Sequence, residues 1–473
     1  MFKNLKILRP VLALLILFIP LYPKFPLSSV PGTYVAIRLD DIIISAAIAI
    51  WIIYQIKNRF PILKLKINGL FIAYFLAIIA STVNAILIYQ TDPTNILVLH
   101  LLRRFEYMSL FFITVSAIKT KKDLLFPYLF LLATTVFVTI YGYGQKYFKL
   151  PVVSTMNSEF SKGQLLQMDV WTRINSTFAG HYDLAAYLSV ALVIIGCVFV
   201  ISKNKYSKII SLLVWLPAFQ IFTFTASRIS TFAFWGAIVL TLIFIRKYLW
   251  IIPVSVIVII SIINSKDLNQ RLLATIPIIT DIFRTNTPTL APKPTTIPVI
   301  IPPPTISARR PTPTPIIIVI TPIPTIFRHG PVDEFIPVDT DVGVARSGEI
   351  RFNAEWPRAI SAFSKNYAVG TGLGSITLAT DNDYLRLLGE SGLLGFISFM
   401  GIIIYFIYKS IPSVFTKKQT ELDILNLILF GGLIATLGNA MFIDVFEASK
   451  TAYIFWIMMG IFYQSITFNV KKT

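Results

Sequence analysis

Runs of apolar residues that are long enough to cross a lipid bilayer recur along the whole of this 473-residue sequence. Most runs hold about 17 to 25 residues, which is the length that a helix needs to cross the hydrocarbon core. In lipid every backbone amide and carbonyl must be bonded internally, so only helices and closed barrels can span it. The residue alternation of an outer-membrane barrel is absent from the sequence. The sequence therefore predicts an all-α, polytopic helical membrane protein.

The composition of the chain agrees with this class. Hydrophobic residues make up 55% of the chain, charged residues 14%, and the mean hydropathy is +0.73. A soluble domain carries more charge, about 25% of its residues. The formal net charge of +19 does not indicate nucleic acid as a partner, because the basic residues stand in short connections between the apolar runs, as the positive-inside bias requires.

Twelve membrane-spanning helices are predicted. Their approximate limits are residues 9–23, 40–56, 68–89, 97–118, 124–145, 182–201, 207–225, 229–245, 248–264, 392–409, 422–443 and 449–468. Lysine and arginine fill every second connection and both ends of the chain. The positive-inside bias therefore predicts a multi-pass protein of the cytoplasmic (inner) membrane, with both termini in the cytoplasm. The first run is as short as that of a signal peptide, but no small-residue cleavage site follows it, so we interpret it as a retained span.

The chain divides into three parts on this interpretation. Residues 1–264 hold spans one to nine, residues 265–391 form a large extracytoplasmic loop, and residues 392–473 hold spans ten to twelve. A shorter outer segment covers residues 146–181. Within the large loop, residues 285–327 are rich in proline and threonine and include twelve of the 28 prolines. Proline lacks an amide donor and has a fixed φ, which favours extended chain, so we assign this stretch no catalytic role.

The sequence offers no residues for a disulfide framework or a metal centre. Cys197 is the one cysteine, and it falls within a predicted span. The three histidines, His100, His181 and His329, are too widely separated to indicate a metal cluster. We therefore expect neither a metal ion nor any other cofactor.

Several ionisable residues fall at membrane depth, where they are costly and need a function or a partner. Arg103, Arg104 and Glu106 lie inside or at the edge of the fourth span, where an Arg–Glu pair is either a structural clamp, the interpretation that we favour, or part of a functional site. Arg173 and Arg228 stand at the outer ends of the sixth and eighth spans. They are either interfacial arginines that reach toward the head groups or phosphate ligands, since small and hydroxyl residues flank both and a guanidinium binds phosphate in a bidentate manner.

Polar residues gather before the tenth span. Three glycines and three capping-type residues follow one another there: Gly370, Gly372, Gly374, Asp381, Asn382 and Asp383. The glycines predict a tight turn with exposed backbone. Aspartate or asparagine at the start of a helix most often acts as its N-cap. Asn382, Arg386 and Glu390 are four residues apart, so they share one helix face, and the last two can form an ion pair.

Four motifs in this order resemble those of the O-antigen ligase and O-antigen polymerase family of bacterial membrane glycosyltransferases. They are YGQKYFKLP (143–151), RINSTFAGHYDLAAYL (173–188), TASRIST (225–231), and RFNAEWPRAISAFSKNYAVGTGLG (351–374) together with DNDYLRLLGESGLLG (381–395). The likeness extends along nearly the whole chain, with about twelve spans and a large outer loop between spans nine and ten. FIDVFEASKTAYIFWIMMGI (442–461) is similar to the last loop and span of the family. The resemblance implies a GT-C type architecture.

The resemblance also implies an activity. A glycan is transferred from a polyprenyl-pyrophosphate carrier to an acceptor at the outer face of the membrane, without a metal ion. Arg173 and Arg228 are the candidates that neutralise the leaving pyrophosphate. The acceptor hydroxyl needs a general base, for which Asp381 is the first candidate and Glu390 the second. The supporting residues implied by the same motifs are His181, Asn382, Arg386, Gly372 and Gly374.

One departure from the family concerns the general base. Asp381 stands where the family has a loop histidine. The related peptidoglycan-polymerising membrane glycosyltransferases are similar in using a loop aspartate, so the change is compatible with catalysis. The acceptor is left open: a glycan on the same carrier would make the protein a polymerase, whereas a different lipid, polymer or protein would make it a ligase.

Two other classes of function remain alternatives. One is an exporter or flippase of lipid-linked saccharide. Transporters usually have broken helices and pseudo-symmetric halves, whereas here the two halves of the sequence look unlike each other. The other is a non-catalytic scaffold of an envelope assembly, which the missing histidine favours. Under each interpretation membrane lipid is a partner and nucleic acid is not.

Overall fold

The computed structural model describes residues 7–29, 36–89, 94–154, 164–166, 173–265, 269, 350–376 and 380–470. These residues are mostly helical, which confirms the predicted all-α class. The helices are Leu8–Leu21 (α1), Leu39–Lys57 (α2), Asn68–Leu87 (α3), Thr94–Ala117 (α4), Leu125–Phe148 (α5), His181–Ile201 (α6), Lys205–Phe224 (α7), Arg228–Phe244 (α8), Ile251–Asn264 (α9), Trp356–Lys365 (α13), Asp383–Phe415 (α14), Glu421–Ala440 (α15) and Ser449–Val470 (α16).

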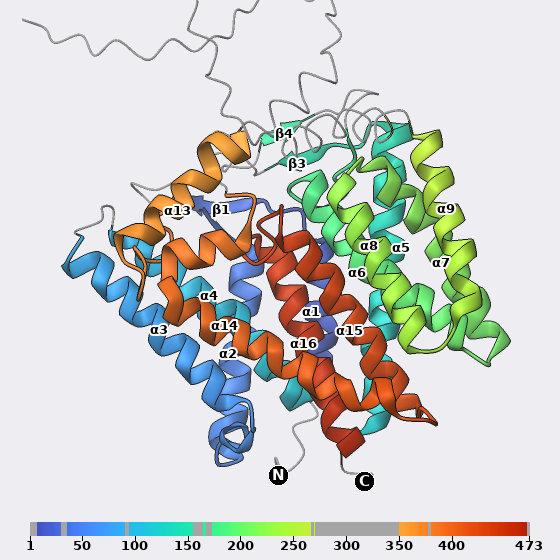
Figure 1. Ribbon diagram of the computed structural model, residues 1–473, viewed down its shortest axis with the longest axis horizontal. Helices are drawn as coiled ribbons and strands as arrows, with labels where there is room; N and C mark the ends of the chain where they lie inside the picture. Colours follow the sequence, from blue (N-terminus) through green and yellow to red (C-terminus); the bar gives the residue numbers. More distant parts are fainter. Residues whose placement is uncertain are drawn as a thin grey trace, which may run out of the picture.

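Two small antiparallel hairpins accompany the helices. They pair Pro26–Ser29 (β1) with Ala36–Arg38 (β2), and Val152–Ser154 (β3) with Gln164–Leu166 (β4). Strands β3 and β4 lie with α13 at one end of the molecule, and the two chain termini lie at the opposite end (Figure 1). A π-helical turn, Arg351–Glu355 (η4), leads into α13.

Each of the twelve predicted spans falls on one of these helices. By length and composition, eight helices within the described ranges are able to cross a membrane, and three shorter apolar helices accompany them. Helix α4 is 24 residues long, but its polar residues, Arg103, Arg104 and Glu106 among them, lower its hydropathy. The structure therefore supports a multi-pass helical membrane protein, while the count of twelve spans and the GT-C likeness stay predictions.

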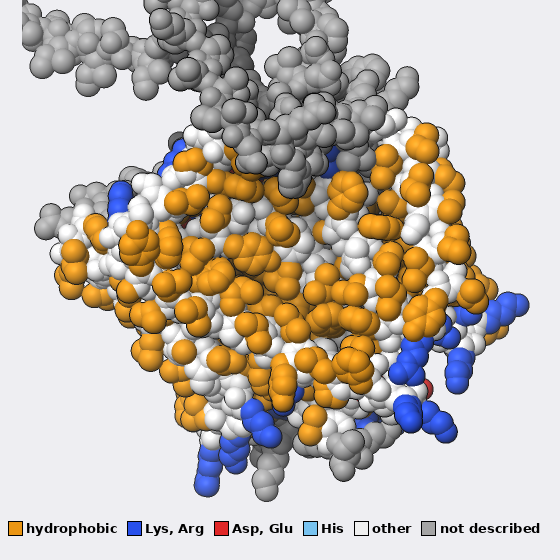
Figure 2. Space-filling model, viewed as in Figure 1, with side chains coloured by type: hydrophobic (Ala, Val, Ile, Leu, Met, Phe, Trp, Pro, Cys, Tyr) orange, Lys and Arg blue, Asp and Glu red, His pale blue; other side chains and the backbone are white. Residues whose placement is uncertain are grey.

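The surface of the described residues has a distinct charge distribution. Figure 2 shows hydrophobic side chains across the middle of the visible face, whereas lysines and arginines gather mainly toward its lower edge. Both termini lie toward that same edge (Figure 1). This distribution agrees with the positive-inside bias. The orientation of the chain in the membrane remains a prediction.

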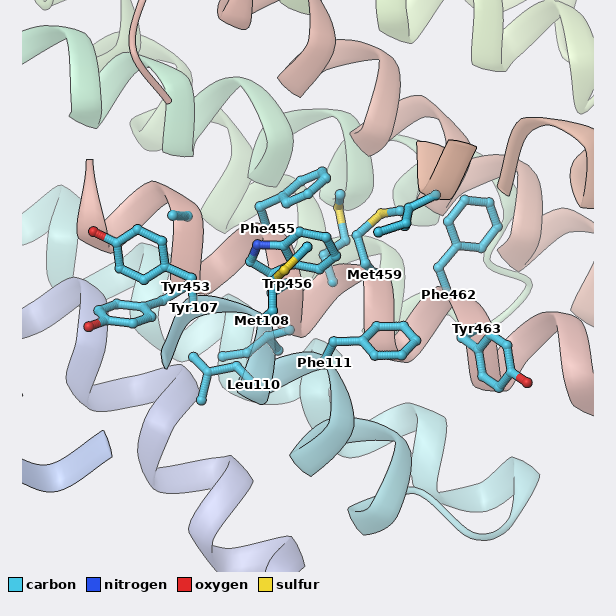
Figure 3. Packing of buried hydrophobic residues seen from close by; sticks show 14 of the residues in the cluster. Tyr107, Met108, Leu110, Phe111, Tyr453, Phe455, Trp456, Met459, Phe462 and Tyr463 are labelled. Carbon is cyan, nitrogen blue, oxygen red and sulfur yellow. The ribbon is translucent and has the colours of Figure 1, made fainter. Parts of the chain in front are cut away.

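Helix α16 runs through the centre of the bundle (Figure 1) and packs mainly on α4, where buried side chains of the two helices face each other (Figure 3). Sixteen of the 22 residues of α16 are buried. The ring of Tyr107 on α4 meets the ring of Tyr453 on α16 edge to face, with centroids 4.9 Å apart. Gly460 permits this approach, because a Cβ at its position would lie 2.6 Å from the Cβ of Thr114. Since lipid offers helices no hydrophobic driving force, such close packing is what holds them together.

Helix α14 is broken at Gly392, whose φ is 62°. A Cβ at this position would lie 2.4 Å from the carbonyl oxygen of Ala368, so only glycine fits without a shift of the backbone. Four backbone hydrogen bonds replace the interrupted helical bonds: Thr371 N–H to Gly389 O (3.0 Å), Gly372 N–H to Glu390 O (2.9 Å), Leu393 N–H to Tyr367 O (2.8 Å) and Leu394 N–H to Ala368 O (3.0 Å). The break therefore leaves these backbone groups bonded, as membrane depth requires.

Candidate active site

The segment that leads into α6 is buried and firmly held. The side-chain amide of Gln145 on α5 forms two hydrogen bonds with the backbone of Ser176, at 2.9 and 2.7 Å. The buried ammonium of Lys450 on α16 donates to the carbonyl of Thr177 at 2.7 Å. Residues 174–180 are all buried. Groups on two other helices thus fix the segment, and with it the residues at its two ends.

Those two ends carry Arg173 and His181, which contact each other directly. The Arg173 Nη1 atom lies 2.7 Å from His181 Nε2. Because a guanidinium can only donate, the imidazole nitrogen accepts in this pair. Both predicted residues are therefore together at the start of α6.

Arg228 begins α8, next to the N-cap residue Ser227. The positive charges of Arg173 and Arg351 both act on Arg228, and the Tyr182 hydroxyl lies near Arg228 and Arg351. Arg228 thus lies within electrostatic range of both Arg173 and Arg351, which come from two other segments of the chain. Like charges held together destabilise the unoccupied site and favour the binding of an anion.

Arg351 connects this group of arginines to Asp381. Its Nε and Nη2 atoms donate to Asp381 Oδ2 at 2.9 and 2.7 Å. Burial raises the pKa of the Asp381 carboxyl above its usual range, although Arg351 acts in the opposite direction, and the charge of Asp444 raises the pKa further. Asp381 is thus an unusually basic carboxylate beside a cation. Sequence reasoning did not single out Arg351.

Glu355 lies close by and was also missed. Partial burial raises its pKa to about 7, with a further contribution from the negative charge of Asp381. Its Oε2 atom is buried and has no hydrogen-bond partner in the part of the chain that the structure describes. Arg351, Glu355 and Arg358 follow one another at helical spacing in RFNAEWPR, and that spacing is the sequence signal that could have found this residue.

The other predicted residues of α14 lie in a second, sealed cluster. Arg386 donates to Glu390 Oε1 and to Asp444 Oδ2, each at 3.2 Å. Asp444 also accepts the backbone N–H of Asn382 at 3.2 Å. Asn382 itself is the N-cap of α14 and accepts from the N–H of Leu385 at 3.0 Å, as expected for its residue type. The cluster ties the start of α14 to the turn between α15 and α16.

Gly372 and Gly374 form the predicted tight turn, with φ of 102° and 80°. Their backbone is buried, so the expectation that it is exposed was wrong. A Cβ on Gly372 would lie 2.4 Å from that of Ala85 on α3, and a Cβ on Gly374 would lie 2.6 Å from the ring of His100 on α4. The glycines therefore permit close packing of this loop against two helices, which the sequence alone did not reveal.

Arg103 and Arg104 of α4 do form ion pairs, but with acidic residues of other segments rather than with Glu106. Arg104 forms an ion pair with Glu447 and donates to the carbonyl of Phe446 at 2.9 Å. Arg103 lies 3.6 Å from Asp41 on α2. These contacts are long-range, so the neighbouring Glu106 was the wrong partner to infer from the sequence.

Some predictions fall on residues that are not described. The proline- and threonine-rich stretch 285–327 and His329 lie outside the described residues. Among the residues that are described, no group of three or more histidine, cysteine, aspartate or glutamate side chains is placed to hold a metal ion. The metal-independent chemistry expected from the sequence stays a prediction.

No protein-family model matches the chain, and no curated protein matches it. The likeness to the O-antigen ligase and polymerase family thus rests on the motifs and their order. The contacts of the arginines and carboxylates described above support a functional hypothesis independently of that likeness.

Proposed function

We propose that the protein transfers a glycan from a polyprenyl-pyrophosphate carrier to an acceptor hydroxyl at the outer face of the cytoplasmic membrane. This is the activity of the O-antigen ligases and polymerases that the motifs resemble. The observation that carries the proposal is that Arg351 binds Asp381 and acts on Glu355, while the charges of Arg173 and Arg351 both act on Arg228. Cations for a leaving phosphate and a base for an incoming alcohol are the two requirements of this transfer.

The arginines act on the leaving group. As the bond between the anomeric carbon and the pyrophosphate oxygen breaks, the bonding electrons stay on that oxygen. The developing negative charge is stabilised by guanidinium groups that are already in place. Arg173 is supported by the buried segment behind it, and Arg351 by Asp381, so neither has to be ordered when the substrate arrives. The polyprenyl pyrophosphate leaves with the charge.

A carboxylate acts on the acceptor. The acceptor oxygen forms a bond to the anomeric carbon, and its proton passes to the base, which later releases it to water. Asp381 is our first candidate, and both hydrogen bonds from Arg351 go to its Oδ2. Glu355 is the second, because a pKa of about 7 suits a base near neutral pH. Glu390 is left out of proton transfer, since it is 1% exposed and bound to Arg386.

A transfer assay with matched arginine variants tests the proposal. Purified protein is given a polyprenyl-pyrophosphoryl oligosaccharide and a glycan acceptor, and the product is measured. Arg228→Ala should lower the rate about a hundredfold or more, the usual loss for one group that stabilises transition-state charge. The control is Arg246→Ala. Arg246 lies just beyond the C-terminal end of α8, and its side chain donates to the backbone carbonyls of residues 416 and 417. Equal rates for the two variants would refute the role of Arg228.

The break in α14 favours export of lipid-linked saccharide as a second candidate function. Interrupted helices line the substrate sites of many transporters, and Gly392 interrupts α14. Proteoliposomes distinguish the two functions. Product without an energy source supports transfer, whereas movement of the lipid-linked saccharide across the bilayer without product supports export.

A further inference from the structure

A slot lies between α2, α3 and α4 and has a volume of about 570 Å³. Helices α2 and α3 each pack on α4 but hardly touch each other. The space between them is therefore not closed by helix packing. A cavity of this kind, at the height of membrane-spanning helices, is accessible to lipid.

One end of the slot is polar and the other is apolar. Asp41 lines it near the start of α2, and Trp51 lines it ten residues further along the same helix, a distance of about 15 Å. On α4, Arg103 and Glu106 line the polar end and Phe112 lines the apolar end. Residues three apart on a helix share a face, so the polar groups of α4 form a row. This gradient matches the head and chain of one lipid molecule.

The polar end holds two carboxylates against one guanidinium. Arg103 lies 3.6 Å from Asp41 Oδ1, beyond hydrogen-bonding distance. That oxygen and Glu106 Oε1 are buried, and neither has a hydrogen-bond partner among the residues described. Buried carboxylate oxygens are costly unless a donor reaches them. Two such oxygens in one slot call for a ligand that is positively charged or rich in hydrogen-bond donors.

We propose that the slot binds a zwitterionic aminophospholipid. Its ammonium, with three N–H donors, lies between Asp41 and Glu106, and an acyl chain extends along Trp51 and Phe112. An anionic head group is repelled by the excess carboxylate. Polyprenyl pyrophosphate is excluded for the same reason, and its hydrocarbon tail has no donor for the two oxygens. This site is independent of the proposed glycan transfer.

Lipid binding to the purified full-length protein tests the proposal. The probes are phosphatidylethanolamine, phosphatidylcholine and phosphatidylglycerol with identical acyl chains, and binding is measured by native mass spectrometry. Phosphatidylcholine has the same net charge but no N–H donor, and phosphatidylglycerol has hydroxyl donors but a negative charge. We expect phosphatidylethanolamine to bind about tenfold more tightly than either, which is the effect of one charge-assisted hydrogen bond. Equal binding of the three, or tighter binding of phosphatidylglycerol, overturns the proposal.

Three variants locate the binding in the slot. Ser45 is an exposed residue of α2 that lines the slot, so Ser45→Trp fills it without disturbing helix packing. Ala46→Trp is the control, because Ala46 is exposed beside it and does not line the slot. The preference for phosphatidylethanolamine should disappear in Ser45→Trp and in Glu106→Gln and persist in Ala46→Trp. A preference that survives Ser45→Trp overturns the assignment, whatever the outcome of the transfer assay.

Discussion

Two arginine–carboxylate clusters lie near the start of α14 and differ in burial. In the open cluster, Arg351 binds Asp381, whose side chain is 30% exposed. In the sealed cluster, Arg386 binds Asp444 and Glu390, which is 1% exposed. A carboxylate that reaches the surface can exchange a proton with a substrate, whereas a sealed one serves to hold chain segments together. The same residue types thus take different roles, and burial decides between them.

The sealed cluster also positions the open one. Asp444 accepts the backbone N–H groups of Thr380 and Asn382, at 3.0 and 3.2 Å, and these residues flank Asp381. Asp381 has a φ of 49°, a conformation that costs free energy for a residue with a side chain. The bonds to Asp444 hold the backbone on both sides of it. Loss of the sealed cluster should therefore unfold this region, while loss of the open one should leave the fold intact.

The largest effect is expected from Arg386→Met. Removing this guanidinium leaves Glu390 and Asp444 without their cation in a buried environment, which costs about 3–5 kcal/mol. The free energy of unfolding and the melting temperature of the purified protein should both fall sharply. The control is Arg246→Ala, because among the described residues the Arg246 side chain binds the backbone carbonyls of Thr416 and Lys417. A melting temperature unchanged by Arg386→Met would remove the distinction between the clusters.

The next effect is expected from Asp381→Asn. The substitution keeps the size of the side chain but removes the basic oxygen, so transfer should fall about a hundredfold or more. The free energy of unfolding should fall less than in Arg386→Met, because Asp381 is 30% exposed and the amide oxygen of asparagine can still accept from Arg351. Rate and melting temperature are measured on the same preparation. If stability falls as far as in Arg386→Met, Asp381 belongs with the sealed cluster.

The pH dependence of the transfer rate and of the stability tests the role of Glu355. Its pKa is raised to about 7 from the usual 4.5, so as a base it becomes active as the pH rises through 7. The folded state binds this proton more tightly than the unfolded state, and the stability contribution falls as the pH rises from about 4.5 through 7. Glu355→Gln should remove this pH dependence from both the transfer rate and the free energy of unfolding. A rate that still rises through pH 7 in this variant would assign the titration to another group.

The smallest effect is expected from Asn382→Ala. This residue caps α14 between the two clusters, and loss of an N-cap costs about 1 kcal/mol. Asn382→Ser keeps a capping oxygen and should restore most of that stability. Thermal unfolding of the two variants measures the difference. Equal melting temperatures would show that Asp444, rather than the cap, holds the start of this helix.

Much of the fold could be predicted from the sequence, while the partners within the site could not. The lengths of the apolar runs and the positions of basic residues are local properties, and all twelve predicted spans fall on helices. The start of α14 was also local, because Asn382 caps it. Arg351 and Asp444 were missed because nothing in their own surroundings in the sequence shows which carboxylate or arginine they meet.

The lengths of the apolar runs and the placement of charge by themselves determined that this chain is a helical membrane protein with polar chemistry concentrated before the tenth predicted span. The tertiary structure alone decided which charged groups meet. Arg104 binds the backbone of Phe446 across 342 residues of sequence, and Asp444 binds Arg386 across 58. It also decided that Glu390 is sealed and Asp381 is open. The physical reason is that burial and pairing depend on how helices far apart in the sequence pack. The length and polarity of a helix depend only on residues that are close together in the sequence.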